Sequence, residues 1–278
     1  NTLSFQDYIY CREITLIINI FYNDSVFYAL KNLVSSLNLS VYDWLLKIHS
    51  LKEQNDSFLK LINQYINETN NELWDSKEHL LEYLSEPKNV DKYISGELGS
   101  NLMYKYKARS VINYLDTLYD VIKQATKEFI QNSFAISMSE ENTNLINSLI
   151  EDLATHNLNR MKNLFNPSID EININYENDI SYWLDDKKVS IGYFQSINDL
   201  ILHLKTNNNS FRICYFHSQE QKDTIGSYKN IFGDSEAGIS RILSRIFLKQ
   251  SFKNYKLFNS SIKSKKYQQI IDKRLMQT

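Results

Sequence analysis

Residues that break regular structure are scarce in this sequence. The 278 residues include only two prolines and six glycines. Average usage of about 5% and 7% would give roughly 14 and 19. Because these residues end helices and shape turns, their scarcity predicts long helices. The hydrophobic fraction of 42% and the charged fraction of 23% are those of a folded protein.

Cysteine is almost absent as well. Cys11 and Cys214 are the only two in the sequence, too few for a disulfide framework or a four-ligand metal site. The sequence also lacks a signal peptide and any uncharged apolar run of about 18 residues. These absences predict a cytoplasmic protein without a membrane segment. Since the sequence begins at Asn1, we expect it to be a piece of a longer protein.

Common catalytic signatures are missing too. The sequence contains no G-x-x-x-x-G-K-[ST], G-x-G-x-x-G or G-x-S-x-G, which argues against the usual nucleotide-hydrolysing and serine-hydrolase sites. The five histidines include no HxxxH or HxH pair of the kind that binds zinc. Cys11 lies beside Arg12 and Glu13, but neighbouring helix residues point in different directions. We therefore interpret Cys11 as a buried or half-buried structural thiol.

Charge is distributed unevenly, although the net charge is only −2. Residues 241–278 hold ten Lys and Arg against one acid, Asp272, which gives this segment +9 and leaves −11 for residues 1–240. A basic segment suits an anionic partner such as nucleic acid. Residues 219–247 also have the outline of a helix-turn-helix that could dock on DNA. The same outline is a common packing unit.

Hydrophobic residues recur every three and four positions from residue 1 to about 166, which predicts a helical domain. The apolar run within residues 3–22 is partly β-branched, but its length favours a buried helix over a strand. Further helices are expected at residues 26–37, 41–49, 58–66, 71–84, 102–131 and 139–165.

Polar side chains mark where several of these helices begin. The oxygens of Asn23-Asp24-Ser25 are expected to cap the second helix. Ser40 and Ser139 are expected to cap two later helices. Pro87 and the glycines that follow it interrupt the pattern, so the expected helix over 102–131 is the longest.

The pattern changes at Asn166-Pro167. Residues 172–176 alternate apolar and polar side chains, as in a half-buried strand. Helical patterns return at 219–233, where Gly233 can end the helix, and at 237–247. Further strands are expected near Trp183, at 189–194 and at 211–216.

These patterns predict the fold class and three parts of the chain. The fold is expected to be mainly α with a small α+β C-terminal part: a helical bundle followed by a short antiparallel sheet with helices. The parts are a helical domain at 1–166, a small α+β subdomain at 167–251 and a basic C-terminal tail at 252–278.

Both ends of the sequence resemble a known family. The segments "FQDYIYCREITLIINIFYNDSVFYAL" and "LNLSVYDWLLKI" are similar to a region that follows the catalytic barrel in radical SAM proteins with an N-terminal cobalamin-binding domain. The segments "YENDISYWLDD", "FRICYFHSQEQKDTIGSYKNIFG" and "RILSRI" resemble the C-terminal part of those proteins. In the first region the likeness is carried by Phe21-Tyr22-Asn23-Asp24, Val26-Phe27 and Asp43-Trp44. Residues 52–165 carry little of it.

The resemblance implies a full-length enzyme that binds S-adenosylmethionine, a [4Fe-4S] cluster and cobalamin and performs radical chemistry. The family's cluster motif is CxxxCxxC, in which three thiolates hold the cluster and leave one iron free for the cofactor. This chain departs from the family there, because Cys11 and Cys214 cannot form that motif. No catalytic, cofactor-binding or metal-ligating residue is therefore carried over. All three cofactors are expected only in upstream domains of the same polypeptide.

The expected function is a non-catalytic accessory region that covers the open end of the barrel and helps to recognise a substrate or a partner protein. Cationic groups could hold an anionic substrate, and the expected contacts are Arg12, His217, Arg241 and Arg245. The alternative is a stand-alone helical binding module, for nucleic acid through the basic C-terminal segment. An enzyme with a site that no motif reveals stays open as a third hypothesis.

Overall fold

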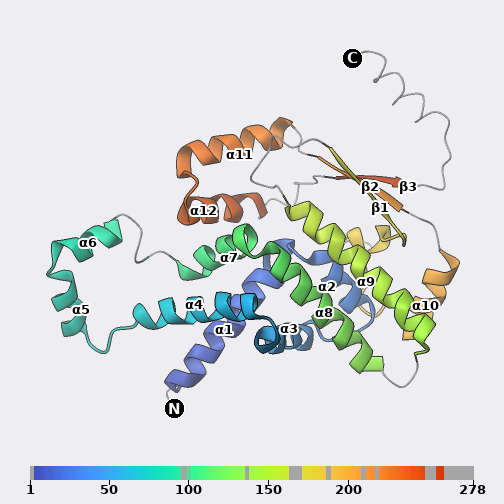
Figure 1. The fold of residues 1–278 in the computed structure, drawn as a ribbon, viewed down its shortest axis with the longest axis horizontal. Coiled ribbons are helices and arrows are strands. Elements are labelled where there is room, and N and C mark those ends of the chain that lie inside the picture. The colour runs from blue at the N-terminus through green and yellow to red at the C-terminus, as the bar shows by residue number, and fades with distance from the viewer. Residues whose placement is uncertain are drawn as a thin grey trace.

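Helices make up most of the molecule, and a small sheet lies at one end (Figure 1). The structure is a computed structural model that describes residues 3–94, 99, 101–134, 138–162, 171–185, 189–207, 211–216, 219–247 and 255–259. Its first elements are α1 (Phe5–Phe21), η1 (Asn23–Ser25), α2 (Tyr28–Ser36), α3 (Val41–Ser50), η2 (Leu51–Gln54), α4 (Asp56–Asn71), α5 (Lys77–Leu84), α6 (Pro87–Ile94), α7 (Leu102–Asn113), α8 (Leu115–Phe134) and α9 (Glu140–Met161). Then follow β1 (Ile172–Tyr176), η3 (Ser181–Leu184), α10 (Ile197–Thr206), β2 (Phe211–Tyr215), α11 (Gln219–Phe232), α12 (Glu236–Phe247) and β3 (Tyr255–Asn259). The predicted fold class, mainly helical with a short antiparallel sheet and helices in the C-terminal part, is confirmed.

Local sequence signals set several helix ends as expected. The run within residues 3–22 is the helix α1, not a strand. The hydroxyls of Ser40 and Ser139 each accept the backbone N–H three residues later, at 3.2 and 3.3 Å. Gly233 ends α11 with φ at 72°, and its N–H donates to the Lys229 carbonyl at 2.8 Å. These caps satisfy backbone groups that a helix end leaves without partners.

Several helix boundaries differ from the prediction, and two of the differences have a clear physical reason. The helix expected over 102–131 is two helices, because the backbone at Tyr114 leaves the helical conformation (φ −128°, ψ 15°). The separate helices meet different partners: α7 packs on α1 and α12, whereas α8 packs on α3 and α9. Pro87 is the first residue of α6, where its missing N–H needs no partner, so it begins a helix instead of interrupting one.

Two predicted strands are absent at their expected places. Trp183 lies in η3, fully buried, and its indole N–H donates to the Ser36 hydroxyl at 3.2 Å. The segment 189–194 is irregular because its backbone binds a helix end: the N–H groups of Gly192 and Phe194 donate to the Ser35 and Ser36 carbonyls, each at 2.9 Å. Both segments therefore complete the C-terminal end of α2.

The sheet is antiparallel with the order β1-β2-β3. The register pairs Ile174 with Ile213 and Ile213 with Leu257. β3 lies within residues 252–278, which we predicted to be a basic C-terminal tail. The prediction rested on the charge of this segment and missed the strand, because β3 pairs with the distant strand β2. A deletion meant to remove basic residues and keep the sheet must therefore begin after Asn259. Residues 260–278 lie outside the described residues.

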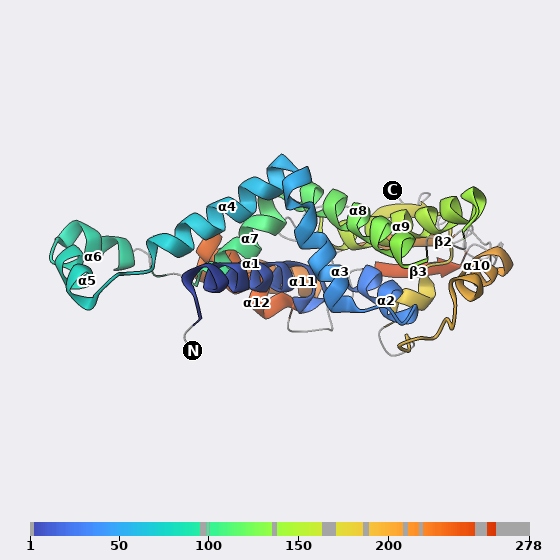
Figure 2. The same ribbon diagram turned by 90° about the horizontal axis from the view of Figure 1, so that it is seen from below.

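Buried side chains from the helices and from the C-terminal part belong to one cluster. The cluster runs from Leu16 in α1 to Leu243 in α12 and includes Trp183 and Ile213. A second, small cluster joins α11 to α12. Figures 1 and 2 show the sheet at one end of the molecule and the helices α5 and α6 at the other. The predicted division at residue 166 stays a prediction, and the large cluster contains residues from both sides of it.

The chain turns sharply between α1 and α2, and we call residues 22–27 the corner. Asp24 and Ser25 adopt left-handed backbone conformations with φ at 60° and 57°, which non-glycine residues take rarely. Phe27 occupies the N-cap position of α2 without a side-chain cap bond. The predicted capping of α2 by Asn23, Asp24 and Ser25 is therefore wrong. The Asp24 carboxylate has another partner.

Two cations from later helices hold the corner. Lys107 of α7, only 2% exposed, forms an ion pair with the Asp24 carboxylate, and its Nζ donates to the Asn23 carbonyl at 3.4 Å. Arg160 of α9 donates from Nη1 to the Ser25 carbonyl at 2.7 Å. The corner is thus fixed by residues far away in the sequence.

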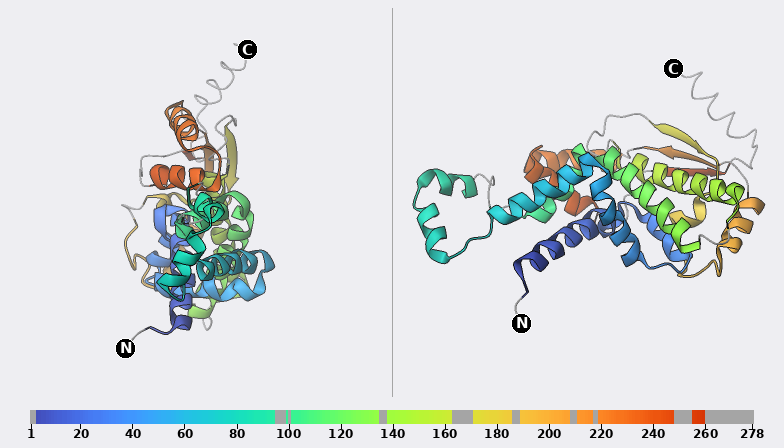
Figure 3. Two further views of the ribbon diagram at one scale, coloured as in Figure 1. Left: turned by 90° about the vertical axis from the view of Figure 1, so that its left-hand side faces the viewer. Right: turned by 60° about the horizontal axis from the view of Figure 1, so that its bottom comes forward.

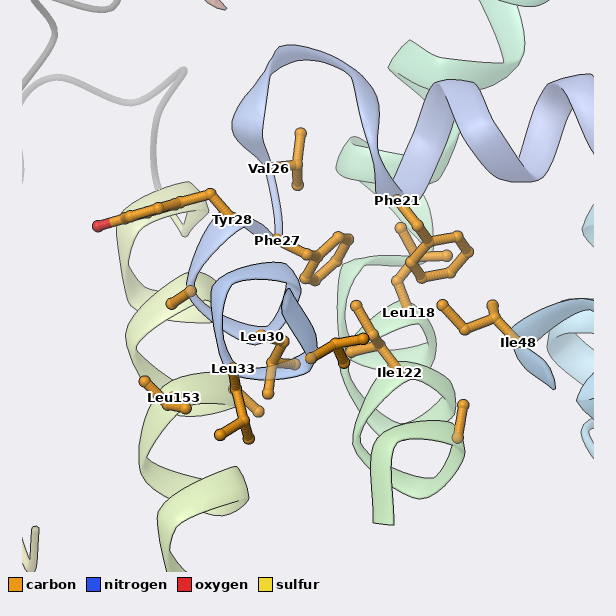
Figure 4. Close-up of a cluster of buried hydrophobic side chains, with 14 of the residues drawn as sticks. Phe21, Val26, Phe27, Tyr28, Leu30, Leu33, Ile48, Leu118, Ile122 and Leu153 are labelled. Carbon is orange, nitrogen blue, oxygen red and sulfur yellow. The ribbon is translucent and has the colours of Figure 1, made fainter. Parts of the chain in front are cut away.

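Apolar packing seats the corner in the core. The rings of Phe21 and Phe27 stack with centroids 5.3 Å apart. Figure 4 shows Phe27 beside α2, Val26 above it, and Phe21 near Leu118 of α8 and Ile48 of α3. The corner therefore sets the position of α2 relative to the helices on either side.

Removal of the Asp24 charge should destabilise the protein strongly. Burial lowers the pKa of Lys107, and the Asp24 carboxylate counteracts that shift. Asp24→Asn keeps the shape and the tolerance for a left-handed backbone, but it leaves a buried ammonium group without its counter-ion. We expect the free energy of unfolding, measured by urea denaturation, to fall by about 3 kcal/mol.

The matched control is Glu141→Gln, which removes a carboxylate from the exposed pair Lys205–Glu141. Exposed pairs contribute little, so the loss should be much smaller. Equal losses in the two variants would contradict the role given to the buried pair.

Candidate functional site

Of the predicted contact residues Arg12, His217, Arg241 and Arg245, the structure describes the side chains of Arg12 and Arg241, and these two contact different helices. Arg12 lies on α1, half-buried, with its guanidinium 5.4 Å from the centroid of the Tyr65 ring in α4. Arg241 is exposed on α12 and lies 5.9 Å from the centroid of the Phe232 ring in α11. The two described arginines therefore pack against different helices.

Two of the predicted contacts, and the nucleic-acid hypothesis, depend on residues that the structure does not describe. His217 lies outside the described residues, and Arg245 lies in α12 with a side chain that is also outside them. Most of the basic residues that motivate nucleic-acid binding follow residue 247, where only β3 is described. The nucleic-acid hypothesis stays a prediction.

Another arginine, Arg109 of α7, does gather charged groups. Its Nε and Nη2 donate to both carboxylate oxygens of Glu236 at 2.6 and 2.7 Å, and this pairing raises the pKa of Arg109. Glu68 of α4 accepts from Lys105 at 2.6 Å and from Tyr106 at 2.8 Å. Because the cations and carboxylates pair with one another, we interpret this cluster as a structural contact that holds α4, α7 and α12 together.

A buried chain of polar side chains joins α2 and α9 to the sheet. Tyr28 Oη lies 2.9 Å from His156 Nε2, and His156 Nδ1 lies 2.8 Å from Tyr215 Oη. Tyr215 Oη lies 2.6 Å from Tyr176 Oη in β1. A neutral imidazole has one donor and one acceptor, so one tyrosine donates to His156 and the other accepts from it. All four side chains are at most 7% exposed, so we interpret this chain as a polar part of the core.

The helices α5 and α6 form an arm, which we define as residues 72–94. The arm projects from the end of α4 and stays clear of the rest of the molecule (Figures 1 and 2, and the right-hand view of Figure 3). No residue of α5 is buried, and Asn89 is the one buried residue of α6. Several apolar side chains of the arm are 36 to 78% exposed, namely Leu73, Leu81, Val90, Tyr93 and Ile94.

The arm contains a cleft of about 490 Å³ between the segment that links α4 to α5, α5 itself and the start of α6. Ser76 caps α5 by accepting the His79 N–H at 3.2 Å. The amide of Asn89 donates to the Tyr83 carbonyl at 2.8 Å and so fastens α6 to α5. The cleft is lined by Leu73, Trp74, Asp75, His79, Glu82, Tyr83, Glu86 and Asn89.

The lining combines aromatic and acidic side chains. The rings of Trp74 and Tyr83 lie with centroids 4.9 Å apart and planes at 48°. The carboxylates come from Asp75, Glu82 and Glu86. Such a lining suits recognition of a ligand by contact and charge. Of the predicted contact residues whose side chains are described, neither Arg12 nor Arg241 lines this cleft.

Sequence reasoning missed the cleft because it looked for cations, whereas the cleft is acidic. It also treated residues 71–84 as one helix, although α4 ends at Asn71 and α5 begins at Lys77. The available signal was the sequence "NELWDSKEHLLEYLSEP", in which a Trp and five acids surround few aliphatic residues. Such a segment has little to bury, which favours exposure.

The cofactors implied by the resemblance do not fit this chain. Cys11 is exposed on α1, so its predicted burial is wrong. Cys214 is buried in β2 with its Sγ 3.5 Å from a Glu171 oxygen. A [4Fe-4S] site of the family type needs three thiolates. Among the described residues, no group of three or more His, Cys, Asp and Glu side chains is arranged to hold a metal ion. No helix in the described part of the chain is long and apolar enough to cross a membrane.

Comparisons with protein-family models, with curated proteins and with solved structures found no match for this chain. The resemblance to radical SAM proteins therefore stays a prediction.

The buried imidazole of His156 should make stability depend on pH. Burial lowers the pKa of His156 well below its ordinary value of 6.5, and the nearby charge of Arg160 acts in the same direction. Below that ordinary value the unfolded chain binds a proton that the folded protein does not. Stability should therefore fall with decreasing pH, by up to about 1.4 kcal/mol per pH unit from this group.

Urea denaturation between pH 7.5 and 5.5 measures this dependence. His156→Gln keeps a donor and an acceptor but cannot titrate, so the free energy of unfolding should vary less with pH in this variant. An unchanged slope in the variant would contradict the account of His156.

Proposed function

We propose that this chain is a non-catalytic accessory region of a radical SAM enzyme and that it recognises a substrate or a partner protein. The arm is the observation that supports this proposal best. We call the described residues outside the arm the body. Exposed apolar side chains and a cleft occur together on the arm, a helical hairpin that packs little against the body. Exposed apolar side chains that gather on one projecting element are typical of an interaction site.

The residues that carry the family resemblance support the accessory role through their structural positions. Phe21, Val26 and Phe27 are buried at the corner. Trp44 is buried in α3, and its indole N–H donates to the Thr126 hydroxyl at 3.0 Å. A family that shares this helical core would be constrained at these positions. The resemblance therefore concerns a fold and not a set of catalytic groups.

In the proposed enzyme, the upstream domains bind S-adenosylmethionine, the [4Fe-4S] cluster and cobalamin. The helical body covers the open end of the barrel, where it keeps solvent from reactive intermediates. The arm extends away from that body and contacts the substrate or partner. This arrangement assigns chemistry and recognition to different parts of one cytoplasmic polypeptide.

The coding sequence upstream of Asn1 tests the family assignment. We expect the reading frame to continue upstream and to encode CxxxCxxC, because the accessory region needs a barrel that holds the cluster. We also expect the purified chain, after anaerobic incubation with iron and sulfide, to retain no stoichiometric cluster.

A stop codon directly before Asn1 would contradict the proposed place of this chain in a larger enzyme. A stoichiometric cluster on the purified chain, with cleavage of S-adenosylmethionine, would contradict its non-catalytic role. Iron analysis and chromatography of the cleavage products measure the second outcome.

A further inference from the structure

We propose that the cleft of the arm binds Lys or Arg side chains of a polypeptide segment. This inference rests on the proposed role of the arm in recognition, and it adds the chemical class of the ligand. The observation that carries it is an aromatic pair and three carboxylates around one open cleft.

The charge of the arm favours a cationic ligand. Residues 72–94 contain six acids and three lysines. Within the cleft, Glu86 pairs with Lys88 at 2.7 Å. The carboxylates of Asp75 and Glu82 have no hydrogen-bond or ion-pair partner among the described residues. They are available to a cation from outside the chain.

Elsewhere in the same chain, aromatic rings and carboxylates together bind Lys and Arg side chains. Lys123 lies with its Nζ 4.4 Å from the centroid of the Tyr119 ring and 3.2 Å from a Glu151 oxygen. Arg109 likewise lies 4.5 Å from the centroid of the Tyr106 ring and pairs with Glu236. In both places a cation is held between an aromatic ring and a carboxylate, an arrangement that combines cation–π and ionic attraction. The cleft offers the same two kinds of group around Trp74.

The surroundings of the cleft favour a polypeptide over a small free amine. The cleft can take a long basic side chain, since its volume of about 490 Å³ is that of a ligand site. Leu73 lines the cleft itself, and Leu81, Val90 and Ile94 are exposed on the same arm. A polypeptide can place apolar side chains on this surface while its Lys or Arg enters the cleft.

Trp74 provides a direct measurement. The other two tryptophans, Trp44 and Trp183, are fully buried, whereas Trp74 is half-buried in the cleft. Titration of the full chain with a hexalysine peptide should change the tryptophan fluorescence in a saturable way. The change should weaken as salt increases, and it should disappear in Trp74→Phe.

Matched variants distinguish binding at the cleft from nonspecific attraction of hexalysine to acidic residues elsewhere. The double variant Asp75→Asn with Glu82→Gln should weaken hexalysine binding by about tenfold. The double variant Glu78→Gln with Asp91→Asn removes the same number of charges from positions of the arm that do not line the cleft, and binding should stay within about twofold. Circular dichroism checks that each variant keeps its helices.

Equal weakening by the two double variants would overturn the proposal, because it would mean nonspecific attraction. A hexaglutamate or Gly-Ser peptide that binds as tightly as hexalysine would overturn the ligand class but leave the arm as a recognition surface. A response of Trp74 to none of these peptides would overturn both the ligand class and the role of the arm. The upstream coding sequence tests the family assignment independently of all these outcomes.

Discussion

The buried ion pair between Lys107 and Asp24 is the interaction on which the arrangement of the helices depends. It holds a left-handed backbone at the corner, where the chain turns between α1 and α2 and the rings of Phe21 and Phe27 stack. Arg160 fixes the other side of the corner through the Ser25 carbonyl. Because a buried charge is costly without its partner, the pair ties the corner to α7.

The position of α2 then determines how the C-terminal part joins the helices. Its last carbonyls accept the N–H groups of Gly192 and Phe194, and Tyr28 reaches His156, which continues to Tyr215 in the sheet. The sheet and the helices thereby belong to one body. Within the described part of the chain the arm has no comparable attachment, since α5 buries none of its residues. A packed body and a loosely attached arm suit a division between support and recognition.

Much of the fold could be predicted from the sequence because it is local. The period of apolar residues located most helices, and Ser40, Ser139 and Gly233 marked helix ends through bonds to residues within four positions. The errors involve distant partners. β3 needs β2, and the break at Tyr114 follows from the different neighbours of α7 and α8. The candidate site was missed for a similar reason. The prediction searched for cationic residues, whereas the residues that line the cleft come together only through the packing of α5 against α6.

Hydrogen–deuterium exchange of the free protein tests the central claim most directly, namely that a recognition arm is carried on a body organised around the corner. The amides of α2, α8 and α9 should exchange slowest, at rates set by global unfolding, because these helices surround the core. The amides of α5 and α6 should exchange much faster while the body stays folded. Protection of the arm equal to that of α2 would contradict the account, because the arm would then be an integral part of the core.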